Sequence, residues 1–129
     1  GACDNPKTCW LTSVAYGAGV FVAVGTGGEL RNNVDGEPWI EVSTDGINWT
    51  PENIQYTSAQ LNQAYILQSV TYGKNGFVAT DGVHVLHSTK GINWTVESFQ
   101  DKSDGIVYVI YDGTRYILYT NNSSYITPS

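Results

Sequence analysis

Apolar residues occur along the chain in short runs that are separated by glycine-rich or polar turns. Residues 11–24 read LTSVAYGAGVFVAV, which is two apolar runs divided by a Gly-Ala-Gly turn. A polar stretch at 25–38 leads to a third run at 39–43, and an Asp45-Gly46 turn leads to a fourth run that begins at Trp49. Runs of this length bounded by turn residues are typical of β-strands joined by hairpins. The first part of the chain therefore predicts four consecutive antiparallel strands.

This unit returns further along the chain. Residues 69–73 match residues 13–17 at an offset of 56 positions. The polar turn Ser-Thr-Asp-Gly-Ile-Asn-Trp, which starts at Ser43, returns from Ser88 and agrees at six of seven positions. A copied turn between copied strands indicates a copied structural unit.

A third, degraded unit begins near Val107. Its apolar positions align with those of the second unit in three pairs, Val109 with Val70, Tyr111 with Tyr72 and Tyr116 with Phe77. No stretch has a sustained helical period; the nearest candidate, residues 57–68, begins polar and carries no apolar stripe. The pattern predicts an all-β fold, and a length of 129 residues fits one domain.

The net charge of −6 limits the classes of partner. Only six Lys and Arg residues occur, scattered singly, so the chain lacks the electrostatic footprint for nucleic acid or an anionic membrane. No apolar run is long enough to cross a bilayer, and residues 1–4 lack the basic start and apolar core of a signal peptide. We therefore expect a mature form or an excised domain, with no nucleic-acid partner and no membrane insertion.

Cys3 and Cys9 are the only two cysteines and lie close together. A disulfide that ties down the N-terminal segment is expected, with two free thiols as the alternative. A metal site is not expected, because two cysteines without a nearby histidine leave a tetrahedral shell half empty. A disulfide would place the protein in an oxidising environment: secreted, periplasmic or at the cell surface.

These repeats resemble the Asp-box, or bacterial neuraminidase repeat, found in sialidase-like β-propellers. The resemblance extends from residue 11 to about 120 and rests on the SVAYG and FVAVG strands together with the STDG-x-x-W turn. The sequence departs from the family box in two ways: one residue between Asp45 and Trp49 is missing, and Lys90 replaces the acid in the second copy.

The resemblance implies four-stranded antiparallel blades of β-propeller type, about two and a half of them. The predicted organisation of the single domain 1–129 is a Cys loop at 1–10, blade repeats at 11–54 and 67–99, and a partial repeat at 107–129. So few blades cannot close a ring. Self-association as a homo-oligomer, a longer parent chain, or a compact β-sandwich of the same sheets would each resolve this.

The box residues are expected to be structural. The hydroxyl or carboxylate at the turn accepts backbone N–H groups, the glycine supplies a positive φ, and the tryptophan packs between sheets. The residues assigned to this role are Ser43, Asp45, Gly46, Trp49, Ser88, Gly91 and Trp94.

In such a blade the short repeated turns share one end, and the long segments 25–38 and 52–65 share the other. Variable loops on a rigid scaffold are common binding sites. The candidate ligand-binding residues there are Arg31, Asn32, Asn33, Asp35, Trp39, Tyr56, Gln60, Asn62 and Tyr65. Aromatic, amide and guanidinium groups suit a protein or a glycan equally; a solvated loop without a ligand is the alternative. The function expected is a non-catalytic extracellular or cell-surface binding or adhesion module without a cofactor.

An enzyme is the alternative, because sialidases use this repeat. They hold the substrate carboxylate with three arginines, whereas this chain has only Arg31 and Arg115, so a glycan-active site would need other chains or missing regions. His84 and His87 do not indicate a metal, because a spacing of three places strand side chains on opposite faces. A structural or assembly subunit is the second alternative.

Overall fold

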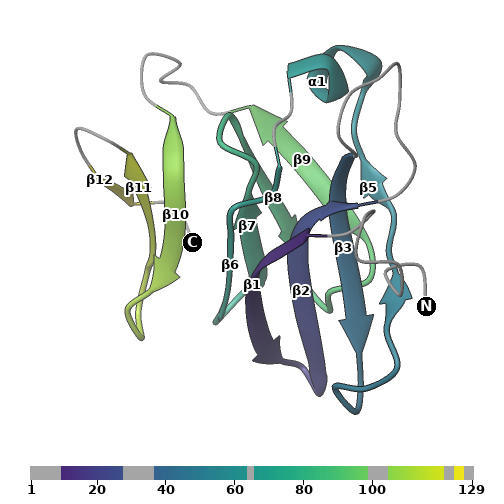
Figure 1. Cartoon of the computed structure of the whole chain (residues 1–129). Coiled ribbons are helices and arrows are strands. Elements are labelled where there is room, and N and C mark those ends of the chain that lie inside the picture. The colour runs from purple at the N-terminus through teal and green to yellow at the C-terminus, as the bar shows by residue number, and fades with distance from the viewer. Residues whose placement is uncertain (1–9, 28–36, 64–65, 99–104, 121–123, 127–129) are drawn as a thin grey trace.

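The computed structural model describes residues 10–27, 37–63, 66–98, 105–120 and 124–126. These residues form three β-sheets that follow one another along the chain, and one short helix (Figure 1). The expected all-β class is confirmed. Within the described residues no sheet closes on itself.

The first sheet is a meander of four antiparallel strands. Its strands are β1 (Trp10–Gly17), β2 (Val20–Gly27), β3 (Glu37–Ser43) and β4 (Thr50–Pro51). The β1–β2 turn consists of Ala18 and Gly19, which both have positive φ. Two positive φ values at the centre of a two-residue hairpin match the right-handed twist of the strands that it joins.

The second sheet is also a meander, with a fifth strand added at its edge. The meander consists of β6 (Ser69–Gly73), β7 (Gly76–Thr80), β8 (His84–Ser88) and β9 (Trp94–Ser98). The added strand β5 (Ile54–Gln55) runs parallel to β9. The second sheet therefore contains the expected four antiparallel strands and one further strand, because the segment that links the first two sheets pairs with the outer edge of the second.

The third sheet has three antiparallel strands. They are β10 (Ile106–Tyr111), β11 (Tyr116–Thr120) and β12 (Ser124–Ile126). Figure 1 shows this sheet beside the second sheet, on the side away from the first.

The helix α1 (Ser58–Gln63) was not expected from the apolar pattern. Its start is set by Thr57 and Gln60, which form a reciprocal capping box: Thr57 Oγ1 accepts a hydrogen bond from the Gln60 N–H at 3.1 Å, and Gln60 Oε1 accepts one from the Thr57 N–H at 2.9 Å. Six residues are too few to show a helical period, so the cap is the better signal here.

Two hydrophobic cores hold the sheets together. The first lies between the first two sheets and contains Val22, Val24, Ile40, Leu67, Val70, Phe77, Ala79, Leu86 and Trp94. The second lies between the second and third sheets and contains Val78, Val109, Tyr116 and Leu118. Successive residues of a strand point to opposite faces, so Phe77 and Val78 of β7 enter different cores. The second sheet is therefore covered on both faces.

We call β1, β6 and β10 the first strands, because each begins the antiparallel meander of its sheet, and β6 is in contact with both β1 and β10. The short β1–β2 and β3–β4 turns lie at one end of the molecule and α1 lies at the other (Figure 1).

Candidate functional site

Several residues predicted from the sequence lie outside the described part of the chain. These are Arg31, Asn32, Asn33, Asp35 and Tyr65, together with the expected disulfide pair Cys3 and Cys9. Asn62 belongs to α1, but only its backbone is described.

Two of the predicted binding residues, Trp39 and Tyr56, line the same shallow groove. It lies at β3, the β4–β5 segment and α1, and its volume is about 410 Å³. Its lining residues are Glu37, Pro38, Trp39, Pro51, Glu52, Asn53, Ile54, Tyr56 and Leu61. We call it the Trp39 groove. Apart from Asn53 and the two glutamates, its described lining is apolar or aromatic, and it contains no Lys or Arg.

The Trp39 side chain is half-buried and held in place by a hydrogen bond. Its Nε1–H donates to Glu41 Oε1 at 3.0 Å, and Glu41 is buried. The two residues are two positions apart on β3 and therefore lie on the same face of the sheet. A fixed indole at a groove is suited to packing against a ligand, because little rotamer freedom remains to be lost on binding.

Glu52 gives the groove its electrostatic character. Its backbone N–H donates to the Ile40 carbonyl, so the residue is anchored to β3. Partial burial raises the pKa of the Glu52 carboxyl above its ordinary value, because desolvation disfavours the charged form. A positively charged or hydrogen-bond-donating ligand group would stabilise the charged carboxylate and so offset the cost of its desolvation.

Tyr56 connects the groove to a buried polar cluster that the sequence analysis did not predict. The Tyr56 Oη–H donates to Asp81 Oδ2 at 2.7 Å, and His84 Nδ1 lies 2.8 Å from the same oxygen. Both Asp81 and His84 are buried. Burial, followed by the negative charge of Asp81, raises the pKa of the Tyr56 hydroxyl well above its ordinary value. Tyr56 is therefore a neutral donor whose hydroxyl is already occupied.

Within the described residues, the Asp81 turn is one of three Asp-Gly turns with the same geometry. In each, Asp Oδ1 accepts the backbone N–H groups two and three residues later, and Oδ2 contacts the side chain three residues later. The three aspartates and their side-chain partners are Asp45 with Asn48, Asp81 with His84, and Asp112 with Arg115. The glycines Gly46, Gly82 and Gly113 have positive φ. This recurrence supports a structural role for the buried Asp81–His84 pair.

The repeated serine turn keeps one contact in both copies. Ser43 Oγ accepts the Gly46 N–H at 2.8 Å, and Ser88 Oγ accepts the Gly91 N–H at 2.9 Å. Lys90 lacks the acceptor oxygens that Asp45 supplies, so the serine contact is the part of the turn that both copies keep.

The two tryptophans of the repeated turn differ in burial. Trp94 is fully buried in the core between the first two sheets, and its Nε1–H donates to the Gly91 carbonyl. Trp49 is only half-buried.

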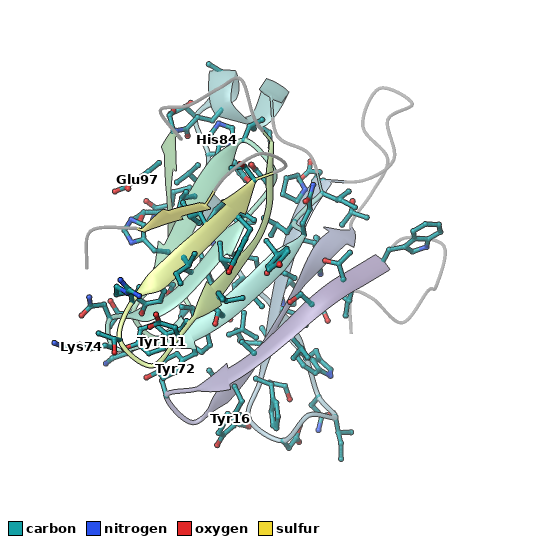
Figure 2. All side chains as sticks on the ribbon, turned by 90° about the vertical axis from the view of Figure 1, so that its left-hand side faces the viewer. Tyr16, Tyr72, Lys74, His84, Glu97 and Tyr111 are labelled. Carbon is teal, nitrogen blue, oxygen red and sulfur yellow. The ribbon has the colours of Figure 1, made fainter. Side chains whose placement is uncertain are left out.

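The remaining candidates have local partners. Gln60 caps α1, and His87 is exposed beside Glu97 at 3.2 Å, whereas His84 points into the buried cluster near α1 (Figure 2). Among the described side chains no group of three His, Cys, Asp or Glu is placed to hold a metal ion. In the same part of the chain, no helix has the length and apolar character needed to span a membrane.

Two sequence signals could have located the unpredicted features. The spacing Thr57-x-x-Gln60 is a capping-box pattern. Asp81-Gly82 repeats the Asp45-Gly46 pair, which would have identified Asp81 as the start of a tight turn rather than as a free carboxylate.

Comparison of the chain with protein-family models, with curated protein sequences and with solved structures finds no match.

Proposed function

We propose that this chain is a non-catalytic binding module built from consecutive blades of β-propeller type, and that the Trp39 groove binds an uncharged or positively charged group of a protein or glycan. The observation that carries the proposal is the immobilised Trp39 indole beside Glu37 and Glu52. We further propose a secreted, periplasmic or cell-surface location, which rests on the two cysteines and the Asp-box resemblance.

The blade arrangement is supported by the order of the sheets. Each of the first two sheets contains a four-stranded meander, and the first strands β1, β6 and β10 are neighbours in chain order. Sheets that pack face to face around adjacent first strands are the arrangement of propeller blades.

The ligand class follows from the groove lining. The indole and the prolines Pro38 and Pro51 offer apolar surface, which suits a sugar face or an aliphatic side chain. The two glutamates disfavour an anionic ligand, and the net charge of −6 adds to this at long range. Neutral oligosaccharides and lysine-containing peptides are therefore the appropriate probes.

The test is a titration of the ¹⁵N-labelled chain with cellotetraose, chitotetraose and a tetralysine peptide. We expect at least one probe to shift the amide signals of Trp39, Asn53 and Leu61. Trp39→Ala should abolish those shifts, whereas Trp10→Ala, which removes an exposed tryptophan outside the groove lining, should leave them unchanged.

Glu52→Gln provides a second variant, because Trp39→Ala also removes the donor to buried Glu41. Glu52→Gln should weaken tetralysine binding and leave oligosaccharide binding nearly intact. The proposal fails if none of the probes shifts the groove signals, or if Trp39→Ala and Glu52→Gln bind as the unaltered chain does.

A further inference from the structure

The two interfaces between sheets use the same backbone contact. Ser13 Oγ on β1 accepts the Val70 N–H of β6 at 3.2 Å. Ser69 Oγ on β6 accepts the Val109 N–H of β10 at 3.1 Å. Each of the first two sheets is therefore joined to the next by a serine on its first strand.

A glycine four residues after each serine makes the second shared contact. The Tyr72 ring lies against Gly17, and the Tyr111 ring lies against Gly73, so closely that a Cβ atom on either glycine would overlap the ring. At both interfaces, a first strand with the sequence Ser-x-x-x-Gly therefore packs against the first strand of the following sheet, which has the sequence Val-x-Tyr. Figure 2 shows Tyr72 and Tyr111 close together at the end of the molecule away from His84.

Strand β1 carries both halves of this interface. Ser13 and Gly17 face β6, and Val14 and Tyr16 are the repeat counterparts of Val70 and Tyr72 at the offset of 56 positions. Because alternate residues of a strand point to opposite faces, Val14 and Tyr16 lie on the other side of the first sheet. Val14 and Tyr16 pair with Ala23 and Phe21 across the strands there.

This side of the first sheet is open where its counterparts are covered. Val14 is 59% exposed, whereas Val70 is 6% and Val109 is 2% exposed. Tyr16 is likewise 59% exposed, against 37% for Tyr72. We call the surface formed by Val14, Tyr16 and Phe21 the open face.

We propose that the open face docks a further repeat sheet whose first strand carries Ser-x-x-x-Gly. The serine of that sheet would accept the Val14 N–H, and its glycine would receive the Tyr16 ring. Two interfaces of this kind already exist in the chain, and the open face presents the same residues in the same spacing.

A second copy of the chain does not supply that partner. Both Ser-x-x-x-Gly strands are already engaged internally. In the third sheet the matching positions are Tyr108 and Asp112, and the Asp112 carboxylate is bound to Arg115. Tyr108 stacks on Tyr119, with ring centroids 4.8 Å apart. A bulky ring therefore stands where the interface needs a serine hydroxyl, and a carboxylate stands where it needs a glycine.

The experiment is an internal duplication of residues 11–66 within the full chain. This places residue 66 of the first copy before Leu11 of the second copy, which keeps the natural spacing of 56 positions. The substitution Thr12→Ser in the second copy changes the mass of the peptide that contains Val14, so the two copies can be distinguished by mass spectrometry. The measurement is hydroxyl-radical footprinting with mass spectrometry, which reports oxidation of Val14.

Oxidation of Val14 in the second copy should fall about tenfold, from the level of a side chain 59% exposed to that of one 6% exposed. A matched duplication with Ser13→Ala and Gly17→Val in the first copy should restore that oxidation. Val14 remaining as reactive as in the unextended chain would overturn the proposal. So would concentration-dependent protection of Val14 in the unextended chain, because it would assign the face to a second copy.

A further measurement covers the case in which the duplicated chain does not fold. In the chain without duplication, Gly17→Val should increase oxidation of Val70, and Gly73→Val should increase oxidation of Val109. If neither valine becomes more reactive, Ser-x-x-x-Gly does not determine docking and the inference is wrong. It rests on the proposed blade arrangement but not on the Trp39 groove, whose ligand titration is read from separate amide signals.

Discussion

The Tyr72 ring of the second sheet lies so close to Gly17 of the first sheet that a methyl group on Gly17 would overlap the ring. Gly73 and Tyr111 repeat this relationship between the second and third sheets. Neither glycine has positive φ, so the absence of a side chain, rather than backbone freedom, is what these positions require. The spacing between neighbouring sheets depends on it.

Gly17→Ala and Gly73→Ala should therefore each destabilise the fold, by about 1–3 kcal/mol for a methyl group forced into a packed interface. Urea denaturation followed by tryptophan fluorescence measures this. Gly105→Ala is the control, because a Cβ there would meet its nearest neighbour at 3.8 Å and the backbone φ is ordinary. Equal stability of all three variants would contradict the packing role.

The tryptophans of the repeated turn form a matched pair for a second test. Trp94→Ala should reduce the free energy of unfolding by about 3–5 kcal/mol, as expected for a fully buried large side chain. Trp49→Ala should have a clearly smaller effect, because Trp49 is only half-buried. Trp94 packs between the first two sheets, whereas no described sheet covers the first sheet in the equivalent way. Chemical denaturation compares the two. A larger loss for Trp49→Ala would show that the first sheet is covered in solution.

Asp81 is predicted to matter more than its exposed equivalent. The Asp81 carboxylate accepts four hydrogen bonds, from Tyr56, Val83 and His84. Asp81→Asn removes the charge of this carboxylate and should destabilise the fold by about 3 kcal/mol. Tyr56→Phe should lower stability by about 1–2 kcal/mol, because one of those donors is lost. Asp112→Asn is the control, since it alters the same turn at the surface. Thermal melting ranks the variants, and the order fails if Asp112→Asn is the most damaging.

Acid should weaken the fold through two exposed turns. The backbone N–H groups of Asn48 and Ile47 lower the pKa of Asp45, and those of Arg115 and Thr114 lower the pKa of Asp112, both from an ordinary 3.8. A carboxyl whose pKa is lower in the folded than in the unfolded state stabilises the fold above the unfolded value. That stability is lost as the pH falls through the folded pKa.

Urea denaturation at pH 7, 5 and 3 should therefore show stability decreasing only below about pH 4 for these groups. The double variant Asp45→Asn and Asp112→Asn should be less stable at pH 7 and should have a flatter dependence on pH in the acid range. An unchanged acid slope in the double variant would show that these turns do not contribute.

The strands and hairpins could be predicted from local patterns. The runs around Gly17–Gly19 and the repeated Ser43 and Ser88 turns are short-range features, and their φ values and backbone hydrogen bonds depend on adjacent residues. The helix α1 was missed because it depends on two capping side chains, Thr57 and Gln60, rather than on an apolar period.

The candidate site was only partly predictable. Trp39 and Tyr56 were identified as loop residues, but their shared groove depends on β5, which follows the first sheet along the chain and pairs with β9 in the second sheet. That pair joins positions 54 and 94, which no local pattern connects. Gln60 was predicted to bind a ligand because amide side chains are common in binding sites, but its amide oxygen caps α1.

The sequence by itself determined the all-β class, the repeated unit and its turns, because alternation and turn chemistry act over a few residues. Only the tertiary structure decided which face of each strand is covered. Val14 and Val70 have nearly the same local sequence context, but Val70 is buried because a sheet packs against it, and Val14 is open because none of the described sheets does. Likewise Asp45, Asp81 and Asp112 share one turn geometry, and only packing makes Asp81 a buried partner of Tyr56. Burial is a property of what lies opposite a residue in space, and the residue's own neighbours in the chain do not specify it.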